Sequence, residues 1–68
     1  MSSVWKKNKL KFYREQAGLT QDQLAKLLNV SQPTIQRWEN GAREPNLQDL
    51  KKLCKALGVK YYDLVDID

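Results

Sequence analysis

Two helix-start signals lie close together in the segment from residue 20 to residue 41, TQDQLAKLLNVSQPTIQRWENG. Thr20 followed by Gln23 is the pattern of a capping box, in which each side chain satisfies the other residue's free backbone amide. Ser31 is a second helix cap, and Asn29 before it tolerates the left-handed conformation of a sharp helix exit. Two capped helices of about two turns each, joined this tightly, cannot pack antiparallel. The segment therefore predicts a helix-turn-helix.

The rest of the chain is expected to form further helices with short connections. The spacing of Leu10, Tyr13, Arg14 and Ala17 marks the inner face of a first helix. An apolar stripe marks a fourth helix, between a cap at Asn46 and a stop at Gly58: Leu47, Leu50, Leu53, Cys54 and Leu57. The predicted helices cover residues from about 4 or 6 to 17, 21–28, 32–40, 47–57 and 61–65. We expect one compact all-α domain of five helices over residues 1–68, without strands.

The exposed face of the helix predicted at 32–40 has a distinctive chemistry. It carries amides, one guanidinium group and a proline ring, on Gln32, Pro33, Gln36, Arg37 and Asn40. Amides and guanidinium groups can make bidentate hydrogen bonds to base edges, and an apolar ring can contact a thymine methyl group. Such a face can also be an ordinary solvated surface, but its position after a tight turn favours DNA recognition. The opposite side of the helix carries Ile35, Trp38 and Glu39.

The run GLTQDQLAKLLNVSQPTIQRWENG resembles the phage repressor and Cro family of helix-turn-helix regulators, also called XRE-like. The T-Q-x-x-L-A, S-x-x-x-I and W-E-N-G elements appear in order, and the similarity continues through Pro45 and NLQDLKKLCKALGV. It extends over residues 8–66, nearly the whole chain. The resemblance implies a lambda-repressor-like fold whose third helix enters the major groove of double-stranded DNA. It implies a transcriptional regulator, most often a repressor, and not an enzyme.

The same resemblance implies a set of site residues. Base contacts are implied for Gln32, Pro33 and Arg37, with Gln36 near enough to help. Phosphate contacts are implied for Gln21 and Asn40, with Thr34 and Arg43 as weaker candidates. Arg14 and Glu39 stand where the family has a partly buried ion pair that ties the first helix to the third.

The net charge of +4 suits an anionic partner, and its distribution is uneven. Four lysines without an acid lie near the start of the chain, at Lys6, Lys7, Lys9 and Lys11. Three aspartates without a base lie in the last six residues, at Asp63, Asp66 and Asp68. The basic end can approach phosphates while the acidic end stays clear of them. The lysines fit a solvated helix face equally well, and the sequence does not indicate which of them contact DNA.

Several classes of chemistry are disfavoured by the residues present. Cys54 is the only cysteine and there is no histidine, so an internal disulfide, a zinc site or a Cys–His nucleophile is not expected. No glycine-rich phosphate loop appears. We therefore expect no cofactor and no metal. Because there is neither a signal peptide nor an apolar run of membrane length, we expect a cytoplasmic protein, associated with the nucleoid through DNA.

The expected partner is operator DNA, read as a palindrome by a homodimer, because the half-site of one helix is small. The helix at 47–57 and residues 58–66 supply the predicted dimer surface, since Val59, Tyr61 and Leu64 add apolar groups there. Two other functions stay open. One is an antitoxin that also binds a toxin, and the other is a protein-interaction module that has lost DNA reading. The chain is expected to be a stand-alone regulator or the first part of a longer repressor.

Overall fold

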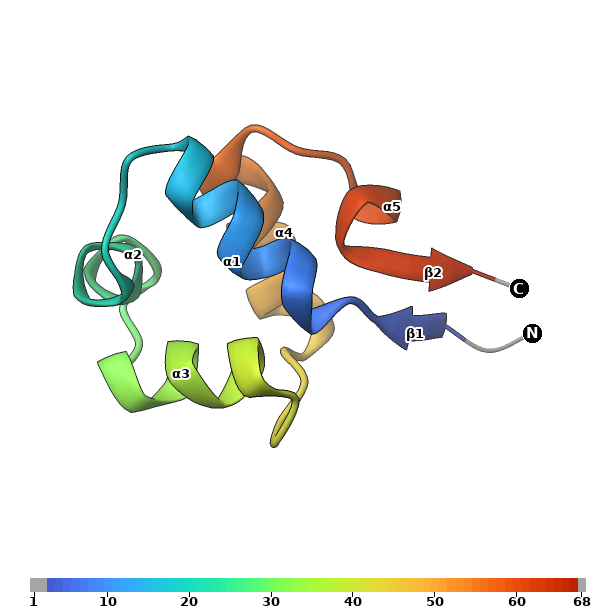
Figure 1. The fold of residues 1–68 in the computed structure, drawn as a ribbon, viewed down its shortest axis with the longest axis horizontal. Helices are drawn as coiled ribbons and strands as arrows, with labels where there is room; N and C mark the ends of the chain where they lie inside the picture. The colour runs from blue at the N-terminus through green and yellow to red at the C-terminus, as the bar shows by residue number, and fades with distance from the viewer. Residues whose placement is uncertain (1–2, 68) are drawn as a thin grey trace.

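A computed structural model describes residues 3–67 of the chain, with the side chains of residues 4–66. Five helices surround one core, and a two-stranded ribbon joins the two ends of the chain (Figure 1). The elements are β1 (Ser3–Trp5), α1 (Lys7–Gln16), α2 (Gln21–Leu28), α3 (Gln32–Asn40), α4 (Leu47–Leu57), α5 (Tyr61–Leu64) and β2 (Val65–Ile67). The predicted five-helix fold is confirmed. Within the described residues, no helix is long and apolar enough to cross a membrane.

The helix-turn-helix has the caps that its sequence predicts. Thr20 Oγ1 accepts a hydrogen bond from the Gln23 amide at 3.0 Å, and Gln23 Oε1 accepts one from the Thr20 amide at 2.8 Å. Asn29 adopts φ 59° and ψ 44°, the left-handed conformation that ends α2. Ser31 Oγ then accepts from the Thr34 amide at 3.3 Å. Both helices therefore begin and end at the predicted residues.

The terminal ribbon contradicts the expectation of a chain without strands. β1 and β2 pair antiparallel, with Val4 opposite Asp66 and Trp5 opposite Val65. The first helix consequently begins at Lys7, and a start at Val4 is wrong. The last helix ends at Leu64, because Val65 is already extended. Each strand is three residues long and pairs only with the far end of the chain. A run this short has no alternation of apolar and polar residues from which a strand could be predicted.

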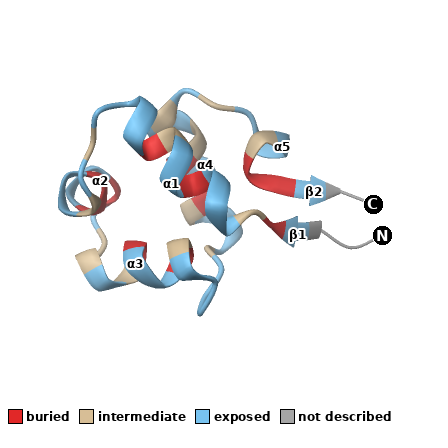
Figure 2. Ribbon diagram, viewed as in Figure 1, coloured by how far each residue is buried: buried red, intermediate tan, exposed pale blue. Residues whose placement is uncertain are grey.

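The core lies where the helices converge, as the buried faces in Figure 2 show. Its largest fully buried side chains are Leu10, Leu24, Leu28, Ile35, Leu53 and Leu64. Two residues of the predicted inner faces are not in it. Ala17 is exposed because α1 has ended at Gln16, and Leu47 is 60% exposed at the first position of α4. Leu64, predicted as part of a dimer surface, is fully buried and cannot contact a partner.

Candidate nucleic-acid interface

A nearly buried ion pair fixes α3 against α1. Arg14 Nε donates to Glu39 Oε2 at 2.6 Å, and Arg14 Nη2 donates to Glu39 Oε1 at 3.2 Å. Arg14 Nη1 also donates to the carbonyl oxygen of Leu19 at 2.8 Å. The hydrogen bond to Glu39 raises the pKa of the Arg14 guanidinium above its ordinary value, although burial opposes this. Because Glu39 is the only acid of α3 and its side chain is 6% exposed, the outer face of α3 carries no carboxylate.

A chain of amides continues from this ion pair to the start of α3. Gln21 Nε2, on the first turn of α2, donates to Glu39 Oε1 at 3.0 Å. Gln32 Nε2 donates in turn to Gln21 Oε1 at 2.6 Å. An amide nitrogen has two N–H groups, so Gln32 keeps one donor and its carbonyl oxygen for another partner. The network therefore orients the Gln32 amide before any ligand is bound.

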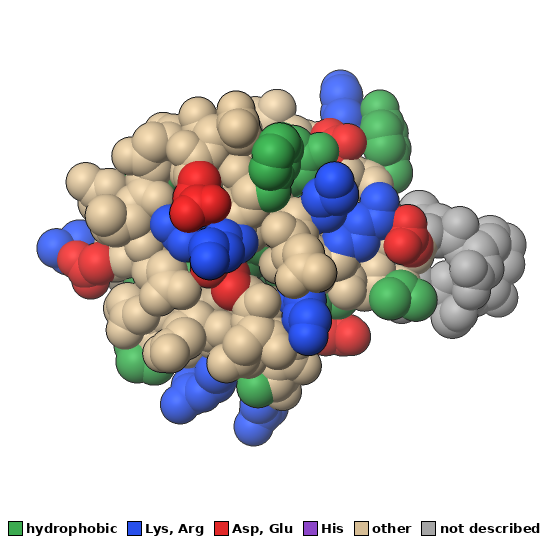
Figure 3. Space-filling view, viewed as in Figure 1, with side chains coloured by type: hydrophobic (Ala, Val, Ile, Leu, Met, Phe, Trp, Pro, Cys, Tyr) green, Lys and Arg blue, Asp and Glu red, His purple; other side chains and the backbone are tan. Residues whose placement is uncertain are grey.

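The remaining predicted base-contacting residues lie on the outer surface of α3. Pro33, Gln36 and Arg37 are exposed, while Gln32 is partly buried by its contact with Gln21. Basic side chains are visible along the lower edge of the molecule, where α3 and the following loop lie (Figure 3). The structure thus gathers an amide, a proline ring and a guanidinium group on one exposed helix face.

The four predicted phosphate-contacting residues have different surroundings. Asn40 Oδ1 accepts from the Ala42 amide at 2.8 Å, which leaves its NH2 group as a donor for an acceptor such as a phosphate oxygen. Arg43 is exposed in the loop after α3. Thr34 Oγ1 lies 2.7 Å from Ser31 Oγ, so its hydroxyl takes part in the helix cap. Gln21, predicted as a phosphate ligand, is also the link between Glu39 and Gln32.

The role of Trp5 was not predicted from the sequence. Its Nε1 donates to the backbone carbonyl oxygen of Trp38 at 2.8 Å in a buried contact. That carbonyl lies in the last turn of α3, where the helix supplies no partner of its own. The ribbon is therefore attached directly to the end of α3. A tryptophan whose ring is apolar and whose N–H needs an acceptor was the available signal.

Known proteins share the sequence pattern and fold of this chain. A helix-turn-helix family model matches residues 10–64, and the chain belongs to this Cro/C1-type family of transcriptional regulators. The chain is 48% identical over 58 residues to an uncharacterized HTH-type transcriptional regulator of Methanocaldococcus jannaschii. That alignment covers 85% of this chain and 88% of the relative. The fold is similar to the P22 c2 repressor in complex with a synthetic operator, with a TM-score of 0.80, 32% identity, and coverage of 85% and 89%.

A shorter similarity links the chain to a differently named protein. It is 49% identical over 47 residues to Multiprotein-bridging factor 1b of Arabidopsis thaliana. That alignment covers 69% of this chain but only 33% of the plant protein. The chain thus spans most of the archaeal relative and about a third of the plant one.

Proposed function

We propose that this protein is a transcriptional repressor that binds double-stranded DNA sequence-specifically and reads the major groove with α3. The observation that carries the proposal is the inward position of Glu39. It leaves only amide, guanidinium and apolar groups on the outer face of α3. A carboxylate on that face would be repelled by phosphates, whereas the groups present match base edges. The proposal needs no cofactor, no metal and no catalytic group.

In this proposal Gln32 and Arg37 read bases from neighbouring turns of α3. The Gln32 amide bonds the N6 and N7 atoms of an adenine, and Arg37 bonds O6 and N7 of a guanine. Their positions differ by about 7.5 Å along the helix axis, at about 1.5 Å per residue, so they reach different base pairs. Pro33 and Gln36 complete the readout, and the phosphate contacts come from Gln21, Thr34, Asn40 and Arg43. Those contacts fix the register in which the bases are met.

Selection of bound duplexes from a random library tests this function. We expect a consensus that contains a G·C pair contacted by Arg37 and an A·T pair contacted by Gln32. A double variant, Gln32→Ala with Arg37→Ala, is the control, because Arg37 is exposed and Gln32 only partly buried, and its fold can be checked by circular dichroism. It should bind weakly and select no consensus. If the natural chain selects none either, the proposed function is wrong.

We also propose that two copies pair on a palindromic operator through α4 and α5. An apolar groove on this side is lined by Leu47, Cys54, Val59 and Tyr61, together with three lysine side chains. Leu47 is 60% and Tyr61 39% exposed, which is unused apolar area for a partner. Burial raises the pKa of the Cys54 thiol, as does nearby Asp63, so the groove contains a neutral thiol.

The dimer proposal predicts both spacing and stoichiometry. Two recognition helices related by a two-fold axis would lie about 34 Å apart, one turn of B-DNA. Sedimentation of the complex should therefore give two chains per duplex. The selected consensus should be an inverted repeat. A complex of one chain per duplex at saturation, or a consensus without symmetry, would contradict the dimer while leaving DNA recognition intact.

Protein bridging is the second candidate function, and the similarity to the multiprotein-bridging factor favours it. A bridging module would need the fold but not base reading, so the selection experiment separates the two candidates. An antitoxin needs a toxin partner in addition to DNA. A stoichiometric protein that co-purifies with this chain would favour that alternative.

A further inference from the structure

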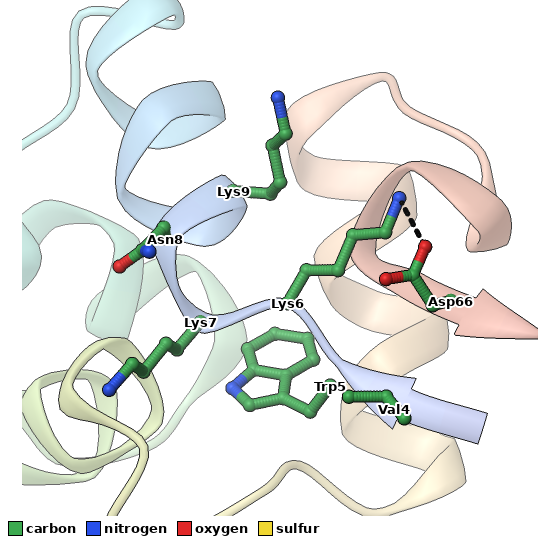
Figure 4. Close-up of a pocket in the computed structure, with 7 residues that line it drawn as sticks. All are labelled: Val4, Trp5, Lys6, Lys7, Asn8, Lys9 and Asp66. Atoms are coloured by element: carbon green, nitrogen blue, oxygen red, sulfur yellow. Dashed lines mark ion pairs between the residues drawn. The ribbon is translucent and has the colours of Figure 1, made fainter. Parts of the chain in front are cut away.

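Three lysines lie at the start of α1, one just before the helix and two in its first turn, and their side chains point in three directions (Figure 4). Lys6 turns toward β2, where its Nζ pairs with Asp66 Oδ1 at 3.1 Å. Lys9 turns away from α3, and its Nζ lies 5.4 Å from the centroid of the Phe12 ring. Lys7 alone extends toward the loop at the end of α3. None of the ion pairs found within residues 3–67 involves Lys7.

Lys7 lies directly against Gly41, the residue that ends α3. A Cβ atom at Gly41 would lie 2.8 Å from Lys7 Cδ and 3.4 Å from its Nζ, so any other residue there would require the lysine side chain to shift. Gly41 has φ 82°, so glycine is favoured there by its backbone as well as by the approach of the lysine. The carbonyl end of α3 carries a partial negative charge, which favours an ammonium group nearby. The next residue back along the chain, Asn40, presents its free NH2 group.

The ribbon determines where Lys7 lies. Trp5 is 9% exposed, and its indole N–H bonds the Trp38 carbonyl in the last turn of α3. The Lys6 amide donates to the carbonyl oxygen of Leu64 at 2.8 Å, which fixes the next residue as well. Lys7 therefore enters α1 from a backbone that is tied to α3 on one side and to α5 on the other.

We propose that Lys7 is an additional phosphate ligand of the DNA interface and that Trp5 is the residue that positions it. This inference rests on the proposed function. Lys7 and Asn40 together present cationic and neutral donors at the carboxyl end of α3. Gln21 lies at the other end of the surface, beside Gln32. A DNA backbone that passes the end of α3 meets Lys7 next to Asn40, whereas Lys6 is neutralised by Asp66 and Lys9 faces Phe12.

The salt dependence of binding tests the proposal without knowledge of the operator. The probe is a mixed-sequence duplex of about 20 base pairs, two helical turns. Each charged phosphate contact contributes about 0.9 to the slope of log K against log salt concentration. We expect Lys7→Gln to lower that slope by about 0.9 for each bound chain and Lys7→Arg to restore it. Lys9→Gln, which removes the same charge from the same helix, should leave the slope unchanged.

A second variant tests the positioning role. Trp5→Phe keeps an aromatic ring in the core but removes the N–H that bonds Trp38. It does not change the net charge, so a purely structural role of Trp5 would leave the slope as it was. We expect the slope to fall toward that of Lys7→Gln, measured at a temperature where the melting curve shows both proteins folded.

The possible failures are distinguishable. If the natural chain does not bind the duplex, the proposed function is overturned and this inference with it. If the natural chain binds but Lys7→Gln keeps its slope, only the inference is overturned. The same holds if Lys9→Gln lowers the slope equally, since the effect would then be one of general charge. It also holds if Lys7→Gln lowers the melting temperature alone, because Lys7 would then only stabilise the end of α3.

Discussion

The two sides of this small domain differ in the interactions that their side chains make. Between α1, α2 and α3, polar groups form one connected network, Arg14–Glu39–Gln21–Gln32, with contacts of 2.6 to 3.2 Å. On the α4 and α5 side, apolar side chains remain in solvent, with Leu47 60% and Tyr62 64% exposed. Hydrogen bonds are directional and set orientations, whereas apolar burial is non-directional. The polar side is therefore suited to recognising DNA bases, and the apolar side is suited to contact with a second copy of the chain.

Breaking the ion pair should have the largest effect on the polar side. Arg14→Met leaves the Glu39 carboxylate nearly buried without its cation, which costs about 3–5 kcal/mol of unfolding free energy when the pair is fully buried. Arg14→Met combined with Glu39→Leu should recover much of this loss. About 1 kcal/mol should remain lost, because the Leu19 carbonyl no longer has its donor. Thermal melts of both single variants and the double variant measure the coupling. Losses that simply add would show that the two residues do not act as a pair.

A substitution on the apolar side should weaken pairing of the two chains and leave the fold intact. Leu47→Glu places a carboxylate in the proposed dimer surface, and we expect it to weaken pairing by about 1.5–3 kcal/mol, the value of one buried leucine. The fold should tolerate the change, since Leu47 is the first residue of α4 and an acid is favourable at a helix start. Leu27→Glu is the matched control, because Leu27 is 63% exposed on α2 and does not line the groove that contains Leu47. Sedimentation of the two variants on DNA compares them, and equal weakening would argue against the α4–α5 surface.

Base reading by Arg37 should be visible as a change of preference. Arg37→Ala removes a bidentate contact with guanine, worth about 1–3 kcal/mol of discrimination against other bases. Affinities for the selected site and for its single-base variants, at one salt concentration, measure this. We expect the variants at the guanine position to become equivalent for Arg37→Ala. If affinity falls by the same factor for every sequence, Arg37 is a phosphate ligand and not a reader.

The helix-turn-helix was predictable to the residue because its signals are local. Thr20, Asn29 and Ser31 each interact within a few residues of the chain, so their side-chain chemistry sets the helix ends directly. The ribbon was not predictable in this way. Trp5 and Val65 are neighbours only in the folded molecule, and three-residue strands show no periodicity.

The residues of the candidate site differ in the same way: some were predictable from local sequence and others were not. Its residues on α3 follow from helical geometry, and the pairing of Arg14 with Glu39 followed from a family resemblance. The hydrogen bond between Gln21 and Gln32 depends on how two helix starts approach each other, which no local pattern encodes. The position of Lys7 beside Gly41 depends on the Trp5 contact with α3, which joins residues 33 positions apart. Both are tertiary facts.

The smallest expected effect on DNA binding distinguishes two residues for which the sequence predicts the same role. Gln21 and Asn40 both stand at positions that imply phosphate contact, yet only Gln21 is bonded to the base-reading Gln32. Asn40→Ala should weaken binding to all sequences by about 0.5–1.5 kcal/mol, the net value of one hydrogen bond. Gln21→Ala should do the same and also release Gln32, so that preference at the adenine position declines. Neither neutral amide should change the salt slope, because no counterion is displaced by an uncharged ligand. Affinities of both variants for the adenine-position variants of the selected site decide the matter. If Gln21→Ala lowers all of these affinities by one common factor, the hydrogen bond from Gln32 to Gln21 does not orient Gln32 for base recognition.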